Sequence, residues 1–324
     1  MRSWQTSSTP KGLFWASLGL LTLLSAALSL GFGSVALSDA PEAAWRIMRY
    51  IRLPRTCAAL LAGAALAAAG AVIQTVLHNP LASPGVIGVN SGAGLLVAVV
   101  CAIAPAAQAY TPAVAFAGAL GAALLVAGIS RYTGASRLTV VLAGVAVSNM
   151  FSAGIDAVVT FVPEALGGVS DYRIGGFSGV TMARLAPAAG MIAAALVILF
   201  TMTRQMDVLS LGAETAQSLG LPVGAVRFTL LVLAAALSGA AVSFAGLLGF
   251  VGLIVPHAMR RFVGEESGAL LAASVLGGAS FVTLCDLLAR VLFAPFELPV
   301  GVVLAFAGGP FFLWLLVRQR GGRG

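Results

Sequence analysis

The sequence contains few charged residues. Asp, Glu, Lys and Arg make up 9% of its 324 residues, whereas 60% are hydrophobic. About a quarter of the residues of a soluble domain are charged, so this chain cannot cover a surface that faces water. A disordered chain is also excluded, because it needs many charges and few apolar side chains. The composition predicts an all-α membrane protein with several spans, since long apolar runs replace the short alternating segments of a barrel.

Cysteine, histidine and catalytic motifs are scarce too. Cys57, Cys101 and Cys285 lie in apolar runs without the spacing of metal ligands, and we interpret them as packing residues. His78 and His257 do not form a His-Glu-x-x-His pair, and the sequence has neither a Gly-x-Ser-x-Gly nor a nucleotide-binding motif. We therefore expect no enzymatic activity, no metal site and no cofactor. If this chain works in a process that uses ATP, a separate subunit must hydrolyse the ATP.

Nine apolar stretches approach the length of about 20 residues that a membrane span needs. They cover residues 13–35, 56–77, 86–105, 112–130, 138–161, 185–203, 228–259, 268–289 and 298–317. Both tails are basic, which places them in the cytoplasm by the positive-inside rule, so the number of crossings must be even. The longest stretch, 228–259, contains Gly246, Gly249 and Gly252. We expect it to hold an outward helix and a short inward one, which gives about ten spans.

Arginines are dense on the outer side of this topology. Four of them fall between Arg46 and Arg55, where the positive-inside rule predicts few. One interpretation is an amphipathic surface helix whose arginines contact lipid headgroups. The other is a docking site for an acidic partner, because a guanidinium binds a carboxylate through two hydrogen bonds. No basic patch carries interleaved aromatic residues, so the net charge of +7 does not indicate nucleic-acid binding.

Two segments interrupt the apolar helices in a similar way. The stretch 56–77 is rich in small residues that allow close helix packing, and His-Asn-Pro follows it at 78–80. The glycine-rich stretch 249–257 again ends in Pro-His. This weak internal repeat would be an inverted one if 56–77 and the first half of 228–259 run in opposite directions. Between the sixth and seventh spans, residues 211–222 form either an ordinary connector or a cytoplasmic helix that rests on a partner.

Five motifs occur in order along residues 40–317. They are Arg-Leu-Pro-Arg at 52–55, Gln74 with Asn-Pro-Leu-Ala at 79–82, Gly-Ala-Glu-Thr-Ala-Gln-Ser-Leu-Gly at 212–220, Gly-Phe-Val-Gly-Leu-Ile-Val-Pro-His at 249–257, and Glu-Leu-Pro-Val-Gly at 297–301. With these motifs the chain resembles the permease of a type II bacterial ABC importer, in the FecCD family that moves iron–siderophores, haem and cobalamin. His78 departs from the pattern, because the family commonly has arginine before Asn-Pro.

The resemblance implies a single permease domain over residues 1–324, with cytoplasmic tails at 1–12 and 318–324 and a cytoplasmic coupling loop at 205–227. It implies a homodimer in the bacterial inner membrane, with two copies of an ATPase subunit below it. A periplasmic or lipid-anchored substrate-binding protein would dock above it. The expected cargo is an iron(III)–siderophore moved by alternating access, with haem or cobalamin as the alternative.

The resemblance also implies roles for residues that match the motifs of the family. Docking of the binding protein is assigned to Arg52, Arg55 and Arg290. Coupling to the ATPase is assigned to Glu214, Ala216 and Gly220. The cytoplasmic gate is assigned to Asn79, Leu81 and Ser136. On the fifth span, the sequence itself indicates that Ser148 and Asn149 either line a polar path or form hydrogen bonds between helices.

Few acidic residues fall inside the predicted spans. Asp156 and Asp286 both lie near the outer ends of their spans, and Asp286 is spaced to pair with Arg290 at i, i+4. Such acids serve either as structural partners or as a proton relay. A secondary transporter driven by an ion gradient is therefore the alternative from another functional class. It would need ion ligands near the middle of the membrane.

Overall fold

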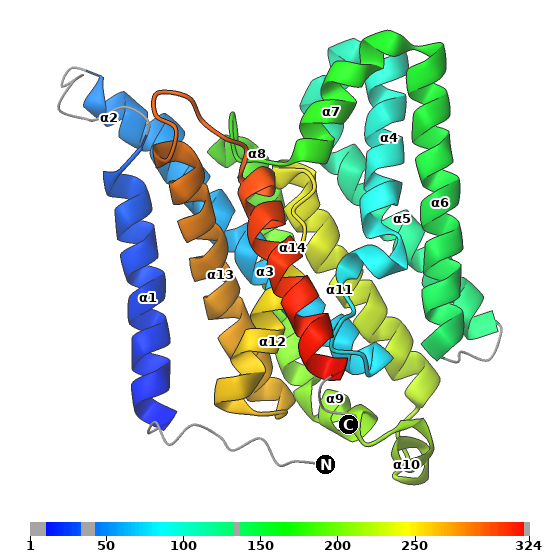
Figure 1. Cartoon of the computed structure of the whole chain (residues 1–324). Helices are drawn as coiled ribbons and strands as arrows, with labels where there is room; N and C mark the ends of the chain where they lie inside the picture. Colours follow the sequence, from blue (N-terminus) through cyan, green and yellow to red (C-terminus); the bar gives the residue numbers. More distant parts are fainter. Residues whose placement is uncertain (1–10, 34–42, 133–136, 321–324) are drawn as a thin grey trace.

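The computed structural model describes residues 11–33, 43–132 and 137–320. Within these ranges the regular structure is helical, and the helices form one bundle (Figure 1). The long helices are α1 (Lys11–Gly31), α3 (Leu53–Leu77), α5 (Thr111–Tyr132), α6 (Arg137–Phe161), α8 (Met182–Thr201), α11 (Val223–Ala245), α13 (Ser267–Val291) and α14 (Val300–Arg320). The shorter helices are α2 (Ala44–Ile47), α4 (Val89–Ile103), α7 (Leu166–Ile174), α9 (Thr203–Ser210), α10 (Ala213–Ser218) and α12 (Val251–Val263).

The predicted polytopic helical fold is confirmed. Among the described residues, seven helical segments are long and apolar enough to cross a membrane, and α4 and α14 are shorter apolar helices. The predicted division of 228–259 is confirmed as well, because α11 ends at Ala245 and α12 begins at Val251. The seven segments together with α4 and α14 are nine apolar helices of the described chain, and only the addition of the short helix α12 would give ten, so the number of ten spans stays a prediction.

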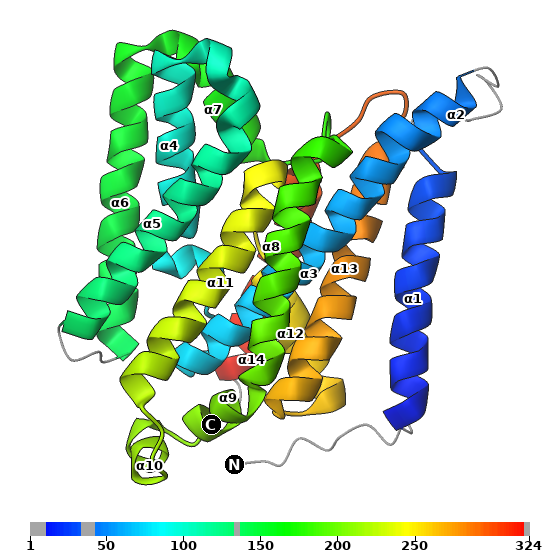
Figure 2. The same ribbon diagram turned by 180° about the vertical axis from the view of Figure 1, so that it is seen from behind.

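The two ends of the bundle differ in what they carry. The start of α1 and the end of α14 lie at the same end as α9 and α10, whereas α2 and α7 lie at the opposite end (Figures 1 and 2). We name these the inner end and the outer end, after the cytoplasmic location that the positive-inside rule predicts for the basic tails. Helices α3 and α11 run in opposite directions, as an inverted repeat requires, but the glycine-rich motif at 249–257 leads into α12. The repeat itself stays a prediction.

Helix α3 is the most deeply buried span, and glycines set its distance from its neighbours. Most of α3 is buried in the described chain, whereas most of α1 faces outward. Gly63 of α3 faces Gly278 of α13, and Gly70 faces Gly252 of α12, so closely that a Cβ at Gly63 or Gly70 would overlap the partner's carbonyl oxygen. Lipid supplies no hydrophobic drive between helices, so this close approach lets van der Waals packing hold the bundle together.

We expect Gly63→Ala to destabilise the purified chain by about 1–3 kcal/mol, because the added methyl group must push the α3 and α13 backbones apart. Thermal unfolding in detergent measures the effect. Gly121→Ala in α5 is the matched control, since nothing lies within 4 Å of a Cβ at that position. Equal unfolding temperatures for the two variants would contradict this account of the packing.

Candidate functional site

A buried group of ionised side chains lies at the outer end. Asp286 of α13 is fully buried, and both of its carboxylate oxygens accept hydrogen bonds from Nε of Arg55, each at 3.1 Å. Arg290 Nε lies 3.1 Å from Asp286 Oδ2, which confirms the pairing at i, i+4. Arg55 Nη1 donates a 2.6 Å hydrogen bond to Glu297, whose side chain is partly exposed. We name Arg52, Arg55, Asp286, Arg290 and Glu297 the outer ion cluster.

The arginines of this cluster also hold the end of α1. Arg52 Nη1 donates to the carbonyls of Leu30 at 2.8 Å and Gly31 at 2.6 Å. Arg290 donates to the carbonyl of Ser29 at 3.2 Å and to its hydroxyl at 2.6 Å. The last carbonyls of a helix lack intrahelical partners and carry partial negative charge. Two guanidinium groups therefore satisfy the C-terminus of α1.

The three arginines predicted to dock a binding protein are thus buried in the described chain. Arg52 is 4% exposed, Arg55 7% and Arg290 2%. The sequence predicted the pairing of Arg290 with Asp286, but it did not predict that Arg55 binds the same carboxylate and Glu297 as well. Arg46 and Arg49, in contrast, are exposed beside the exposed rings of Trp45 and Tyr50. That arrangement fits side chains at a headgroup surface.

The predicted coupling residues lie on a protruding segment at the inner end. Helix α10 projects below the bundle, and α9 lies at the inner end level with the ends of the other helices (Figures 1 and 2). Glu214 is exposed, whereas Ala216 is fully buried against the rest of the chain. Gly220 follows α10 with φ +84°, the left-handed conformation that commonly ends a helix. Leu211 and Leu219 flank α10 and are more than half exposed. The segment therefore presents both charge and apolar surface outward. We name residues 203–220 the coupling segment after the predicted role of Glu214, Ala216 and Gly220.

Asp207 is a residue that the sequence analysis missed. It lies on α9, and its carboxylate accepts a 2.8 Å hydrogen bond from the backbone N–H of Ser267, the first residue of α13. The N-cap residue of α13, Glu266, makes no side-chain cap itself. A carboxylate at a helix N-terminus satisfies a free N–H and opposes the helix dipole. Asp207 therefore ties the coupling segment to the start of α13.

Two of the predicted gate residues, Asn79 and Leu81, lie on the turn after α3. Asn79 is exposed, and its side-chain oxygen accepts a 2.9 Å hydrogen bond from the N–H of Leu81, which stabilises the turn. His78 ends α3 with φ 47°, a left-handed conformation more common for glycine. Ser136 lies outside the described residues. Asn149 is exposed on α6, separate in sequence from the turn.

Gln74 supports this region from inside. Its amide nitrogen donates to the carbonyl of Gly252 at 3.1 Å, and its amide oxygen accepts a short hydrogen bond from Arg260. Arg260 in turn lies 3.4 Å from Glu265. The sequence marked Gln74 only as part of a motif. In the structure, the buried amide of Gln74 joins α3 to the start and to the end of α12.

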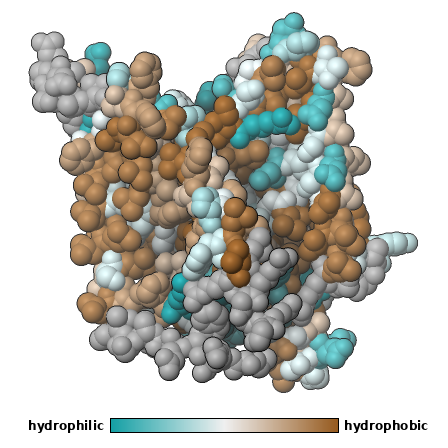
Figure 3. Space-filling view, in the orientation of Figure 1, coloured by the Kyte–Doolittle hydropathy of each residue, from teal (hydrophilic) through white to brown (hydrophobic). Residues whose placement is uncertain are grey.

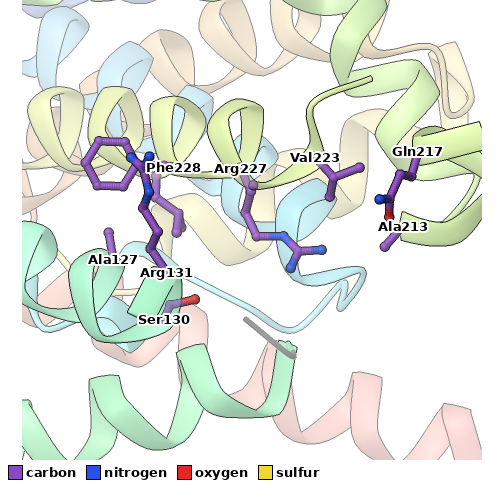
Figure 4. Close-up of a pocket in the computed structure, with 10 residues that line it drawn as sticks. Ala127, Ser130, Arg131, Ala213, Gln217, Val223, Arg227 and Phe228 are labelled. Carbon is purple, nitrogen blue, oxygen red and sulfur yellow. The ribbon is translucent and has the colours of Figure 1, made fainter. Parts of the chain in front are cut away.

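A cavity of about 320 Å³ lies beside the coupling segment, between α5, α10 and α11. Figure 4 shows Arg227 extending into it, with Gln217 of α10 on one side and Arg131 of α5 on the other. The Arg131 guanidinium lies 5.8 Å from the centre of the Phe228 ring. Motion of α10 would therefore change a contact surface shared with two membrane helices. Among the described residues, no group of three His, Cys, Asp or Glu side chains could hold a metal ion.

We expect Asp286→Asn to destabilise the chain by about 3–5 kcal/mol, because it leaves two buried arginines without their shared carboxylate. Purified yield and thermal unfolding in detergent measure the loss. Asp156→Asn is the matched control: Asp156 is exposed, and its pair with Arg173 at 3.5 Å contributes at most about 1 kcal/mol. Similar stability of the two variants would show that the outer ion cluster does not hold the helices together.

Comparisons with known proteins agree over nearly the whole chain. Residues 15–318 match the FecCD transport family. The chain is 36% identical over 319 residues to the hemin transport system permease protein of Yersinia pestis, covering 95% of both chains. It is 35% identical to an Fe(3+)-citrate import system permease protein of Bacillus subtilis, covering 92% of this chain and 93% of that one.

A solved structure is similar as well. A metal-chelate type ABC transporter in an inward-facing conformation superposes with a TM-score of 0.87 and 28% sequence identity, covering 95% of this chain and 99% of that one. Sequence and fold therefore agree across the same length, and the chain belongs to the FecCD transport family.

Proposed function

We propose that this chain is the membrane-spanning subunit of an ABC importer that carries an iron(III) chelate. The observation that carries the proposal is the similarity, over 95% of the chain, both to a hemin permease and to a metal-chelate type ABC transporter structure. Two copies of the chain would form the path, with two ATPase subunits at the inner end. A periplasmic or lipid-anchored binding protein would deliver the chelate at the outer end in the bacterial inner membrane.

The coupling segment is the proposed contact for the ATPase. Exposed Glu214 and the exposed apolar side chains of Leu211 and Leu219 offer a mixed surface of the kind that protein interfaces use. Buried Ala216 anchors α10 to the chain, and Gly220 lets the backbone turn sharply after it. The Asp207 contact then carries motion of α9 to α13.

Docking at the outer end would involve an exchange of carboxylates. Arg55 is the docking arginine whose neighbour Glu297 is partly exposed, and both line a cavity of about 480 Å³. A glutamate of the binding protein could reach Arg55 by replacing Glu297. Arg52 and Arg290 would then position the cluster through their contacts with α1 rather than touch the partner.

The gate would lie on the turn after α3. Leu81 is half-buried there and Asn79 fixes its backbone, so the turn can move as one piece. Leucine side chains meeting from two copies of the chain would close the path by excluding water. Asn149 on α6 would face the path. Alternating exposure of the path to the two sides follows when ATP binding below shifts the coupling segments.

An ion-gradient transporter is the alternative function. It requires unpaired acidic residues or other ion ligands inside the spans. Asp286 already binds Arg55 and Arg290, and Asp156 is exposed at the outer end beside Arg173. These contacts favour structural pairing over a proton relay.

Reconstitution tests the proposed function directly. Proteoliposomes holding the chain with its ATPase and binding protein should accumulate an iron(III) chelate labelled with radioactive iron, and only when ATP is supplied. Chain alone under a proton gradient should accumulate none. Uptake by the chain alone would replace the proposal with the ion-gradient alternative. Comparison of ferric citrate, a ferric hydroxamate and haemin identifies the cargo class, because the relatives are named after different cargoes, hemin and Fe(3+)-citrate.

We expect Gly220→Val to lower transport per ATP several-fold while ATP hydrolysis continues, because valine is strained at φ +84° and redirects the end of α10. Uptake and phosphate release are measured on the same proteoliposomes. Gly190→Val in α8 is the matched control, since nothing lies within 4 Å of a Cβ there. A normal ratio of uptake to hydrolysis in Gly220→Val would place the coupling contact elsewhere.

A further inference from the structure

The cavity of about 320 Å³ between α5, α10 and α11 lies where the spans leave the membrane at the inner end. Arg131 comes from the last turn of α5 and Arg227 from the beginning of α11, so both reach the same level. Hydrophilic surface covers α10 at this end, whereas apolar surface covers much of α1 (Figure 3). Tyr132, beside Arg131, is 94% exposed. Exposed aromatic rings of membrane proteins gather at the level of the lipid headgroups, so the cavity lies at that level.

The lining of this cavity carries positive charge. Of the ten described residues that form it, Arg131 and Arg227 are charged, and none is acidic. Glu214 follows the lining residue Ala213 on α10, but it is exposed and does not line the cavity. A hollow lined by charge of one sign raises the local concentration of ions of the opposite sign. The cavity therefore favours an anionic ligand.

The two arginines differ in how firmly the protein holds them. Arg227 is 5% exposed, and its guanidinium extends into the cavity (Figure 4). Arg131 is exposed, and its guanidinium lies over the ring of Phe228. A planar guanidinium binds the oxygens of a phosphate group through two parallel hydrogen bonds. A phosphate in the cavity would thus contact one guanidinium that is fixed by packing and one that can adjust to it.

Uncharged groups of the lining add to this potential. Helix α11 begins at Val223, and the first N–H groups of a helix carry partial positive charge that attracts anions. Gly224 of this first turn lines the cavity, and nothing lies within 4 Å of a Cβ at that position, so a ligand can approach the backbone. Gln217 of α10 contributes an amide group on another side. The start of α11 therefore assists the two arginines.

Apolar side chains continue the cavity toward the middle of the membrane. Ala127 lies one turn before Arg131 on α5, and Leu231 lies one turn after Arg227 on α11, and both line the cavity. On the same face of α5, Leu124 lies two turns before Arg131 and is 40% exposed. Two turns of helix span about 11 Å. Polar groups at the inner end and apolar groups above them follow the order of headgroup and acyl chains in a phospholipid.

The size and the lining of the cavity select among anions. Ligand pockets commonly measure about 300–1,000 Å³, so a cavity of about 320 Å³ takes a group of headgroup size. Phe228 is the aromatic residue of the lining, and Arg131 lies over its ring, so the base of a nucleotide finds no open ring to stack on. The apolar residues above the arginines suit acyl chains and offer nothing to a soluble phosphate.

We propose that this cavity binds the phosphate group of an anionic phospholipid, with Arg131 and Arg227 on the phosphate oxygens and the acyl chains along the Leu124 face of α5. Basic pockets between membrane helices on the cytoplasmic side bind anionic headgroups in this way. The site depends neither on the cargo nor on the use of ATP. Because Ala213 and Gln217 border the headgroup, the bound lipid also contacts α10, the helix that carries the predicted coupling residues.

Lipid binding by the full-length chain tests the site. The purified chain in detergent is titrated with phosphatidylglycerol, or with phosphatidylcholine of the same acyl chains, and native mass spectrometry counts the bound lipids. We expect tighter binding of phosphatidylglycerol, because the arginines repel the choline group. Arg131→Gln should weaken this binding about tenfold, since it removes a charge-assisted contact with the phosphate. Arg204→Gln is the matched control: Arg204 is an exposed arginine of α9 outside the lining, so the affinity should not change.

Equal affinity for the two lipids, or an equal loss in Arg131→Gln and Arg204→Gln, would overturn the site. Glycerol phosphate carries the headgroup without acyl chains and should not displace the lipid. If it does, the cavity binds a soluble phosphate instead. Release of phosphatidylglycerol when the ATPase subunit binds would assign the arginines to an acidic contact with that subunit. The importer is judged by the uptake assay alone, so failure of the lipid site leaves the proposed function in place.

Discussion

The carboxylate of Asp286 is the contact on which the outer half of the bundle depends. It is fully buried and binds Arg55 of α3 and Arg290 of its own helix. Buried charges are tolerated only when they are paired, and removing one partner leaves the others uncompensated. Arg290 and Arg52 extend the same network to the carbonyls that end α1. The positions of α1, α3 and α13 are therefore interdependent, although lipid provides no hydrophobic drive to hold them together.

The second constraint is that backbone groups inside a membrane need partners within the protein. The break after Ala245 frees several of them, and the segment around α7 supplies two of the missing bonds. Gln74 binds the Gly252 carbonyl on the first turn of α12. Because these partners lie on other elements, the interruption creates both a short α12 and a cavity beside it.

Local sequence patterns predicted the features that depend on residues close to one another in the sequence. The length of the apolar runs predicted the spans, and three glycines predicted the break in 228–259. The spacing of four residues predicted the pair of Asp286 and Arg290. Burial of Arg55 could not be predicted in this way, since its partner lies 231 positions away. An arginine at the outer end of a span looks exposed until tertiary contact supplies an acid. Asp207 was missed for the same reason, because the N–H that it binds lies 60 positions away.

Helix α13 connects the two ends of the molecule. At its inner end Asp207 of the coupling segment binds its first N–H group, and near its outer end it carries Asp286 and Arg290. In between, Gly278 meets α3 backbone to backbone, which leaves little room for the two helices to slide. No proline interrupts α13. The helix that carries two members of the outer ion cluster is therefore the same helix whose first N–H group binds Asp207 of α9, so one continuous element contacts both ends of the molecule.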